Sequence, residues 1–139
     1  MKVLMLIVAD HASVETSTGK LNILGAFRQI QAGTFPAQHH TMSLVIKLGG
    51  GIGDKPNPHS LSISLVGEDG AELLSISGAF DMPRGMPGIQ PEFNAVMEFR
   101  DIVFAHPGTY SFVVKVDNDE EITDQTVIQV DQIQRQAQE

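Results

Sequence analysis

The sequence predicts an all-β domain, an antiparallel two-sheet β-sandwich of about eight strands, with a small β-barrel as the alternative. Short segments alternate apolar and polar residues with a period of two, and Gly, Pro, Asn and Asp separate these segments. No segment carries the sustained 3.6-residue apolar stripe of a helix. Any helix should therefore be a single turn or lie in a frayed tail. We expect one sandwich domain over 1–131 and a polar C-terminal tail over 132–139.

The clearest strand covers 59–67, where Leu61, Ile63 and Leu65 alternate with serines, so that one face is buried and the other meets water. We place strand ends to within about two to four residues. The expected strands cover 2–11, 20–31, 42–48, 59–67, 71–81, 93–104, 109–117 and 121–131.

Turn residues predict how these strands connect. Glu68-Asp69-Gly70 predicts a hairpin, since glycine adopts a positive φ at the least cost. The stretch Val116-Asp117-Asn118-Asp119-Glu120 predicts a second hairpin. Gly25 and the pair Arg100-Asp101 shift the alternation by one residue, which predicts a bulge or a bend between sheets. The Gly- and Pro-rich stretches 48–59 and 81–93 have no periodicity and should be surface loops.

The opening segment, MKVLMLIVADHASVE, is either a signal peptide or the first strand. Its one lysine and seven apolar residues meet the requirements of an export signal only at their minimum. A turn at Thr18-Gly19-Lys20 then leads into another alternating segment, which favours a strand. Val3, Met5, Ile7 and Ala9 should share one face, and Leu4, Leu6 and Val8 the other. Since a sandwich strand normally has one wet face, either this chain or another subunit must cover the second one.

Composition excludes several classes of function. The 139 residues include no cysteine, which excludes disulfides, thiolate metal sites and cysteine nucleophiles and fits a reducing cytosol. Asp and Glu number 17 against 9 Lys and Arg, a net charge of −8, and the basic residues form no run, which argues against nucleic-acid binding. No stretch approaches the roughly 20 apolar residues that span a bilayer, so we expect no membrane partner.

Two groups of residues are candidate metal ligands. His39 and His40 would point to opposite faces of a strand, so they could share a metal only from a loop. The acidic residues Asp117, Asp119 and Asp124 could offer hard oxygen ligands to Ca²⁺ from one end of the sandwich, although the spacing of an EF-hand is missing. Solvated acids on a hairpin turn explain the second group equally well.

The remaining motifs indicate no cofactor. The glycine-rich stretch 49–55 has no Ser or Thr after its lysine and no helix behind it, so it should be a flexible loop. No nucleophile motif such as G-x-S-x-G occurs. Met82 and Met86 lie in the loop 81–93, where flexible side chains suit either a protein contact or a lid on the sandwich end.

Several segments together resemble a family of small bacterial all-β proteins of unknown function. The resemblance rests on LIVADHASVETSTGKLNILGAF, Thr34-Phe35-Pro36, Glu68-Asp69-Gly70 and Pro107-Gly108-Thr109-Tyr110-Ser111-Phe112, and it extends over nearly the whole chain. It implies that the opening segment belongs to the body of the protein, a bacterial source and a cytoplasmic setting. It implies no catalytic residue.

We therefore expect a cytoplasmic, non-enzymatic binding or assembly module, with a second copy or another protein as its partner. Leu4, Leu6, Val8, Met82 and Met86 are the expected contact residues. A Ca²⁺- or small-ligand-binding sandwich is the first alternative. The second is a hydrolase built on scattered His and Asp residues, in which two or more of the five histidines would share a pocket, namely His11, His39, His40, His59 and His106.

Overall fold

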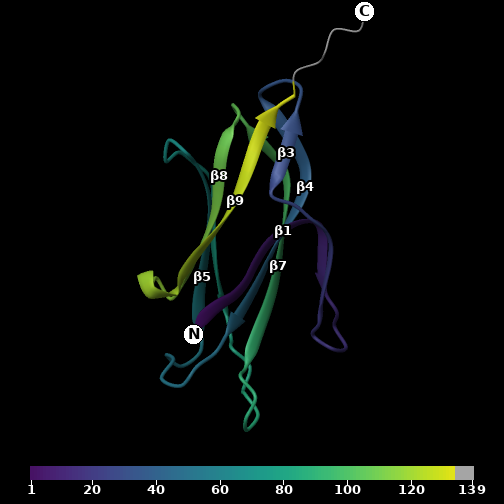
Figure 1. The fold of residues 1–139 in the computed structure, drawn as a ribbon. Coiled ribbons are helices and arrows are strands. Elements are labelled where there is room, and N and C mark those ends of the chain that lie inside the picture. The colour runs from purple at the N-terminus through teal and green to yellow at the C-terminus, as the bar shows by residue number, and fades with distance from the viewer. Residues whose placement is uncertain (134–139) are drawn as a thin grey trace, which may run out of the picture.

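The computed structural model describes residues 1–133 and forms a sandwich of two β-sheets (Figure 1). One sheet has the order β2-β1-β4-β7 and consists of β1 (Lys2–Val14), β2 (Leu21–Ala26), β4 (Ala37–Gly49) and β7 (Glu92–Phe104). The other has the order β3-β9-β8-β5-β6 and consists of β3 (Gln29–Ala32), β5 (His59–Gly67), β6 (Glu72–Phe80), β8 (Gly108–Val116) and β9 (Thr123–Gln132). Over the described residues the two sheets do not close into a barrel, which confirms the sandwich. The predicted tail lies outside this range from residue 134 onward.

Three predicted turns connect antiparallel neighbours. β1 and β2 pair across a turn with Gly19 at a φ of 71°, and β5 and β6 pair across Gly70 at 82°. β8 and β9 pair across Asp117 and Asn118, whose φ values of 52° and 51° suit the short polar side chains of Asp and Asn. Between β8 and β9 lies a single 3₁₀ turn, η1 (Glu120–Ile122), as short as the sequence predicts. No helix within residues 1–133 is long and apolar enough to cross a membrane.

The segment 20–31 is two strands, not one. Gly25 adopts a φ of 73°, and the chain leaves the first sheet after Ala26 to join the second as β3, which pairs parallel to β9. The predicted bend between sheets at Gly25 is therefore confirmed, and the single strand is wrong. β4 also begins at Ala37 rather than at 42, because its polar first residues pair with β7 without an apolar alternation. At Asp101 the φ is 55°, yet the pairing of β7 with β4 keeps its register, so the predicted bulge is absent at this position.

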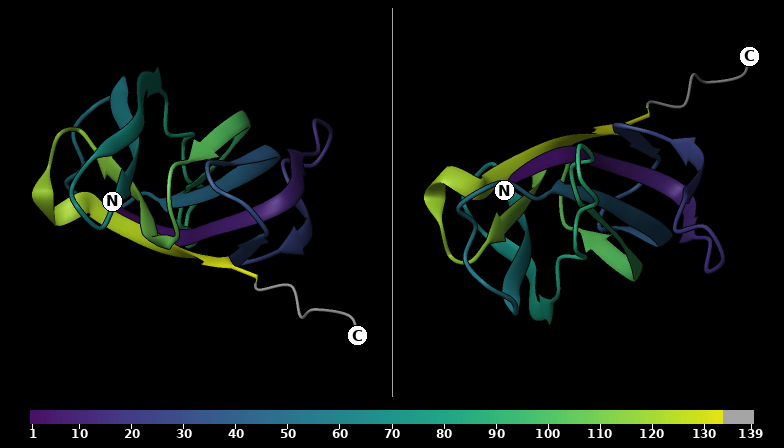
Figure 2. Two further views of the ribbon diagram at one scale, coloured as in Figure 1. Left: turned by 90° about the horizontal axis from the view of Figure 1, so that it is seen from above. Right: turned by 90° about the horizontal axis from the view of Figure 1, so that it is seen from below.

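The core lies between the two sheets, which Figure 2 shows from both ends. Alternate residues of β4 face it, and Met42, Leu44, Ile46 and Leu48 are fully buried. Across the interface, Phe99 of β7 stacks on Phe112 of β8, with ring centroids 5.4 Å apart. Burial of these side chains from both sheets is what holds the layers together.

The outer face of the first sheet is partly covered by this chain itself. Val45 points away from the core side of β4 and is nevertheless fully buried. The turn between β1 and β2 reaches the same face, where Asn94 Nδ2 of β7 donates a hydrogen bond to the Gly19 carbonyl at 3.0 Å. Cover within the chain, one of the two alternatives for β1, therefore applies to part of this sheet.

A bulge changes which residues of β1 face the core. The register between β1 and β4 shifts between Val3 and Met5, with Leu4 as the extra residue. As a result Val3 packs against the core together with Leu6 and Val8. The predicted division of faces is therefore wrong at Val3, because an unbroken alternation takes no account of an inserted residue.

Candidate functional site: a groove along β1

The first half of β1 has a free edge. β4 pairs with β1 from Lys2 onward, but on the opposite side β2 pairs with it only from Ala9 onward. The last backbone hydrogen bond on that side is from the Phe27 N–H, which donates to the Val8 carbonyl at 2.9 Å. Over Lys2–Ile7, which we call the β1 edge, no strand within residues 1–133 pairs with β1 on this side.

β9 has a matching free edge in the other sheet. β8 pairs with β9 along nearly its whole length, whereas β3 pairs only with Gln129–Gln132. Figure 2 shows β1 and β9 side by side along one side of the sandwich in both views. Between β2 and β3 the chain crosses from one sheet to the other at Phe27 and Arg28, and the Arg28 carbonyl accepts a hydrogen bond from Gln129 N–H at 2.8 Å. In the view of Figure 1, this crossing covers the upper part of the side between β1 and β9 and leaves the lower part open.

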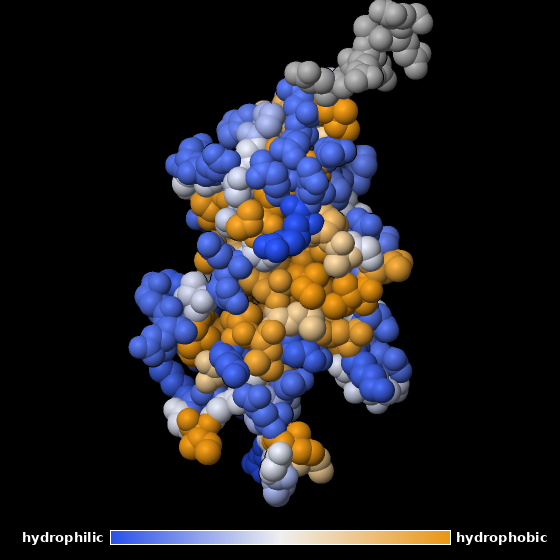
Figure 3. Space-filling model, viewed as in Figure 1, coloured by the Kyte–Doolittle hydropathy of each residue, from blue (hydrophilic) through white to orange (hydrophobic). Residues whose placement is uncertain are grey.

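The open half is a groove of about 530 Å³ between β1 and β9. Its apolar lining comes from β1 and the crossing, and its polar lining from β9 and from Arg28 in the crossing. Leu4 is 38% exposed, and Met5 and Ile7 are half-buried. Figure 3 shows apolar side chains gathered in the middle of this face, where β1 runs in Figure 1. The groove residues are Leu4, Met5, Leu6, Ile7, Val8, Ala26, Phe27, Arg28, Asp124, Gln125 and Thr126.

Two exposed charges of opposite sign line the groove. Arg28 lies at its closed end and Asp124 near the start of β9. Neither takes part in an ion pair within the described part of the chain. Asp124 Oδ1 accepts a hydrogen bond from the Gln125 N–H at 2.8 Å, which leaves its other oxygen for a partner.

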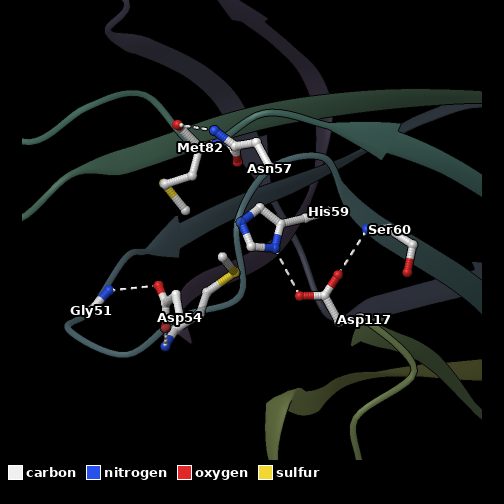
Figure 4. A network of polar contacts seen from close by, with 8 residues as sticks. Gly51, Asp54, Asn57, His59, Ser60, Met82 and Asp117 are labelled. Carbon is white, nitrogen blue, oxygen red and sulfur yellow. Dashed lines mark hydrogen bonds and ion pairs between the residues drawn. The ribbon is translucent and has the colours of Figure 1, made fainter.

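A polar network lies at the end of the sandwich where β1 begins (Figure 4). His59, the first residue of β5, has a side chain only 2% exposed, and its Nδ1 lies 2.8 Å from Asp117 Oδ2. Because a carboxylate can only accept, Nδ1 carries the hydrogen. The other oxygen, Asp117 Oδ1, accepts from Ser60 N–H at 3.0 Å. Burial would raise the pKa of Asp117, but the hydrogen bonds from His59 and Ser60 and the charges of His59 and Lys55 outweigh it and lower that pKa.

Neighbouring loops complete this end of the sandwich. Asn57 makes two hydrogen bonds to the backbone of Met82, from its Nδ2 to the carbonyl at 3.1 Å and from the Met82 N–H to its Oδ1 at 2.9 Å. Asp54 accepts a hydrogen bond from Gly51 N–H (Figure 4). It also accepts one from the Met1 amino group. Desolvation opposes ionisation of Asp54, yet these bonds lower its pKa. The network thus ties both long loops to the sandwich, and we assign it a structural role.

The three candidate Ca²⁺ ligands make different contacts. Both oxygens of Asp117 already accept hydrogen bonds, and Asp119 caps η1 by accepting from Glu121 N–H at 2.9 Å. Asp124 lines the β1 groove instead. A hollow of about 360 Å³ does bring Asp117 and Asp119 together with Asp54 and Lys55. Among residues 1–133 no group of three His, Cys, Asp or Glu side chains is placed to hold a metal ion.

The two adjacent histidines lie on a strand rather than in a loop. His39 and His40 are both in β4, so their side chains point to opposite faces. The His39 ring lies 5.7 Å from the ring of Phe27, and His40 Nδ1 lies 3.4 Å from Asp101 Oδ1 at the surface. The loop position that a shared metal requires is therefore absent for this pair.

The expected contact residues divide into two groups. Leu4 lies at the β1 edge, and Met86 is 69% exposed at the tip of the loop 81–91. Val8 and Met82 are instead buried in this chain, and Leu6 packs partly against the core while also lining the groove. Met82 thus behaves as a lid on the sandwich end.

Sequence reasoning missed the pair of His59 and Asp117 and the charges of the groove. The register of β5 with β8 places Ser60 opposite the turn after Val116, where the Asp117 N–H donates to the Ser60 carbonyl. Residue type alone singles out His59 and Asp117 separately. Only the pairing of β5 with β8, which are about fifty residues apart, could have joined them.

Fold and groove define the class of protein: a β-sandwich, antiparallel except where β3 pairs with β9, with one side left open between its sheets. The chain belongs to a family of unknown function, DUF6941, whose model matches residues 4–131. This confirms the resemblance to a family of small all-β proteins of unknown function. No curated protein matches the chain at a significant level.

Proposed function

We propose that the protein is a cytoplasmic, non-enzymatic binding module that takes a protein partner along the β1 edge. The observation that carries the proposal is an apolar strand whose edge is unpaired over Lys2–Ile7 and opens into a groove that is apolar on the β1 side. An unpaired edge offers backbone N–H and C=O groups to another strand, and apolar side chains beside it gain from burial.

The bulge at Leu4 limits how much of this edge can pair. A bulge interrupts a regular ladder, and Lys2 places a charge at the start of the strand. Both features protect against uncontrolled edge-to-edge aggregation. They leave a short pairing segment, Met5–Ile7, so side chains in the groove must supply the rest of the contact.

Site-specific photo-crosslinking in the cell of origin tests this proposal. A photo-reactive amino acid at Leu4, which is 38% exposed, should yield cross-linked protein species that mass spectrometry can identify. Val103 in β7, which is 50% exposed and two strands away from β1, is the matched control and should yield few. Equal yields at both positions, or none at Leu4, would contradict the proposal.

A further inference from the structure

The two charged residues of the groove, Arg28 and Asp124, lie at its opposite ends. Arg28 lies at the closed end, level with Gln129 of β9 because its carbonyl accepts the Gln129 N–H. Asp124 lies five residues earlier on β9, which in an extended strand is about 17 Å toward the open end. The groove therefore carries a positive charge at one end, a negative charge at the other, and apolar β1 side chains between them.

Such an arrangement is complementary to itself. β1 and β9 run in the same direction along this side of the sandwich (Figures 1 and 2). A second copy rotated by 180° about an axis through the middle of the groove has its strands antiparallel to the first. Arg28 then lies opposite Asp124 of the partner subunit, and by symmetry the same pair forms a second time. The two apolar stripes meet between these pairs.

We propose that the partner along the β1 edge is a second copy of this chain, bound groove to groove about a twofold axis with the two β1 strands antiparallel. This inference rests on the proposed function, since it names the occupant of the same surface. Rotation about a twofold axis gives a closed dimer, whereas a head-to-tail contact along one strand direction would give open chains.

Local charge complementarity in the groove offsets the long-range repulsion between two acidic copies. The protein carries a net charge of −8, so two copies repel at long range, and a self-contact needs local attraction to form. The two exposed pairs of Arg28 and Asp124 supply it at the ends of an apolar patch. Lys2, the nearby cation on β1, does not line the groove and stays exposed.

Charge reversal combined with mixing tests the dimer. Sedimentation velocity over a range of concentrations should show a monomer–dimer equilibrium for the unmodified protein. R28D and D124R should each weaken the dimer by roughly tenfold or more, because each places like charges at both ends of the interface. R100D on β7 and E72R on β6 make the same changes in charge at exposed positions away from the groove and should leave the equilibrium unchanged.

Mixing the two groove variants gives the decisive result. In a heterodimer of R28D with D124R, the first subunit carries an acidic side chain at both groove positions and the second carries a basic one at both. Each end of the interface then joins an acidic to a basic side chain, so both pairs attract. The mixture should therefore regain the stability of the original dimer. If the substitutions leave the monomer–dimer equilibrium unchanged, the dimer uses another surface. That result would overturn the inference.

A second measurement does not depend on the variants folding. Photo-crosslinking from Leu4 in a mixture of ¹⁴N- and ¹⁵N-labelled purified protein should join peptides of mixed label within residues 2–28. A strict monomer at millimolar concentration, or no mixed peptide, would overturn the inference. If Leu4 then still cross-links to a different protein in cells, the proposed binding function stands and only the identity of its partner is wrong.

Discussion

Replacing Asp117 with alanine should destabilise the sandwich strongly, because its side chain ties the turn after β8 to the start of β5. Its carboxylate accepts hydrogen bonds from His59 Nδ1 at 2.8 Å and from Ser60 N–H at 3.0 Å, and its backbone has a φ of 52°. Loss of each hydrogen bond to a largely buried group costs about 1–1.5 kcal/mol. Alanine at a left-handed φ costs about 1 kcal/mol more.

These contributions add to a loss of about 3–4 kcal/mol in the free energy of unfolding, or a fall in Tm of about 10 °C. Urea denaturation at pH 7 measures it. Asp117→Asn should lose only about 1–2 kcal/mol, since asparagine tolerates the left-handed backbone and can still accept from Ser60. Asp81→Ala, an exposed position just after β6, should change stability by about 0.5 kcal/mol or less. A loss below about 1 kcal/mol for Asp117→Ala would refute the structural role given to the network.

Three further predictions follow from the same structure. The pKa of Asp117 is lowered in the folded protein, so its ionised form stabilises the fold at pH values above the ordinary pKa of 3.8. This contribution disappears as pH falls through the folded pKa. In urea titrations, the stability difference between the unmodified protein and Asp117→Asn should therefore shrink from pH 7 to pH 3. Gly25→Ala should lower the free energy of unfolding by about 1–2 kcal/mol, because the φ of Gly25 is 73° and a Cβ there would lie 2.5 Å from Asp10 Oδ2. Gly33→Ala is the control and should change the free energy of unfolding little, because there is open space around Gly33. Calorimetric titration of EDTA-treated protein with Ca²⁺ should give no binding heat, since both oxygens of Asp117 already accept hydrogen bonds; a clear saturable heat would instead support the alternative of a Ca²⁺-binding sandwich.

Local sequence patterns were sufficient to predict the features that depend on residues close together in the sequence. The turn at Gly70, the turn at Asp117 and Asn118, and the bend at Gly25 all require backbone conformations that few residue types adopt. For this reason their positions can be predicted from residue type alone. The strands between them follow from the alternation of apolar residues, because a sandwich buries one face of each strand.

Other features depend on partners distant in sequence and leave no local pattern. The parallel pairing of β3 with β9 joins residues about a hundred positions apart. The polar residues at the start of β4 form a strand because β7 pairs with them, although their own sequence does not alternate. The same applies to His59 and Asp117, and to Arg28 and Asp124, which come to the same groove only after two sheets have assembled.

The structure gives two physical causes for the two-faced hydrophobicity of β1. Val3, Leu6 and Val8 are apolar because they pack on the core, and Ala9 is apolar because it is fully buried within the chain. Neither cause accounts for Leu4, Met5 and Ile7, which remain partly exposed beside an unpaired edge. Three such residues close together on an otherwise acidic protein cost solubility unless another surface covers them. Their exposure is therefore best explained by an intermolecular contact, and it is at these residues that the proposed dimer buries most of its apolar surface.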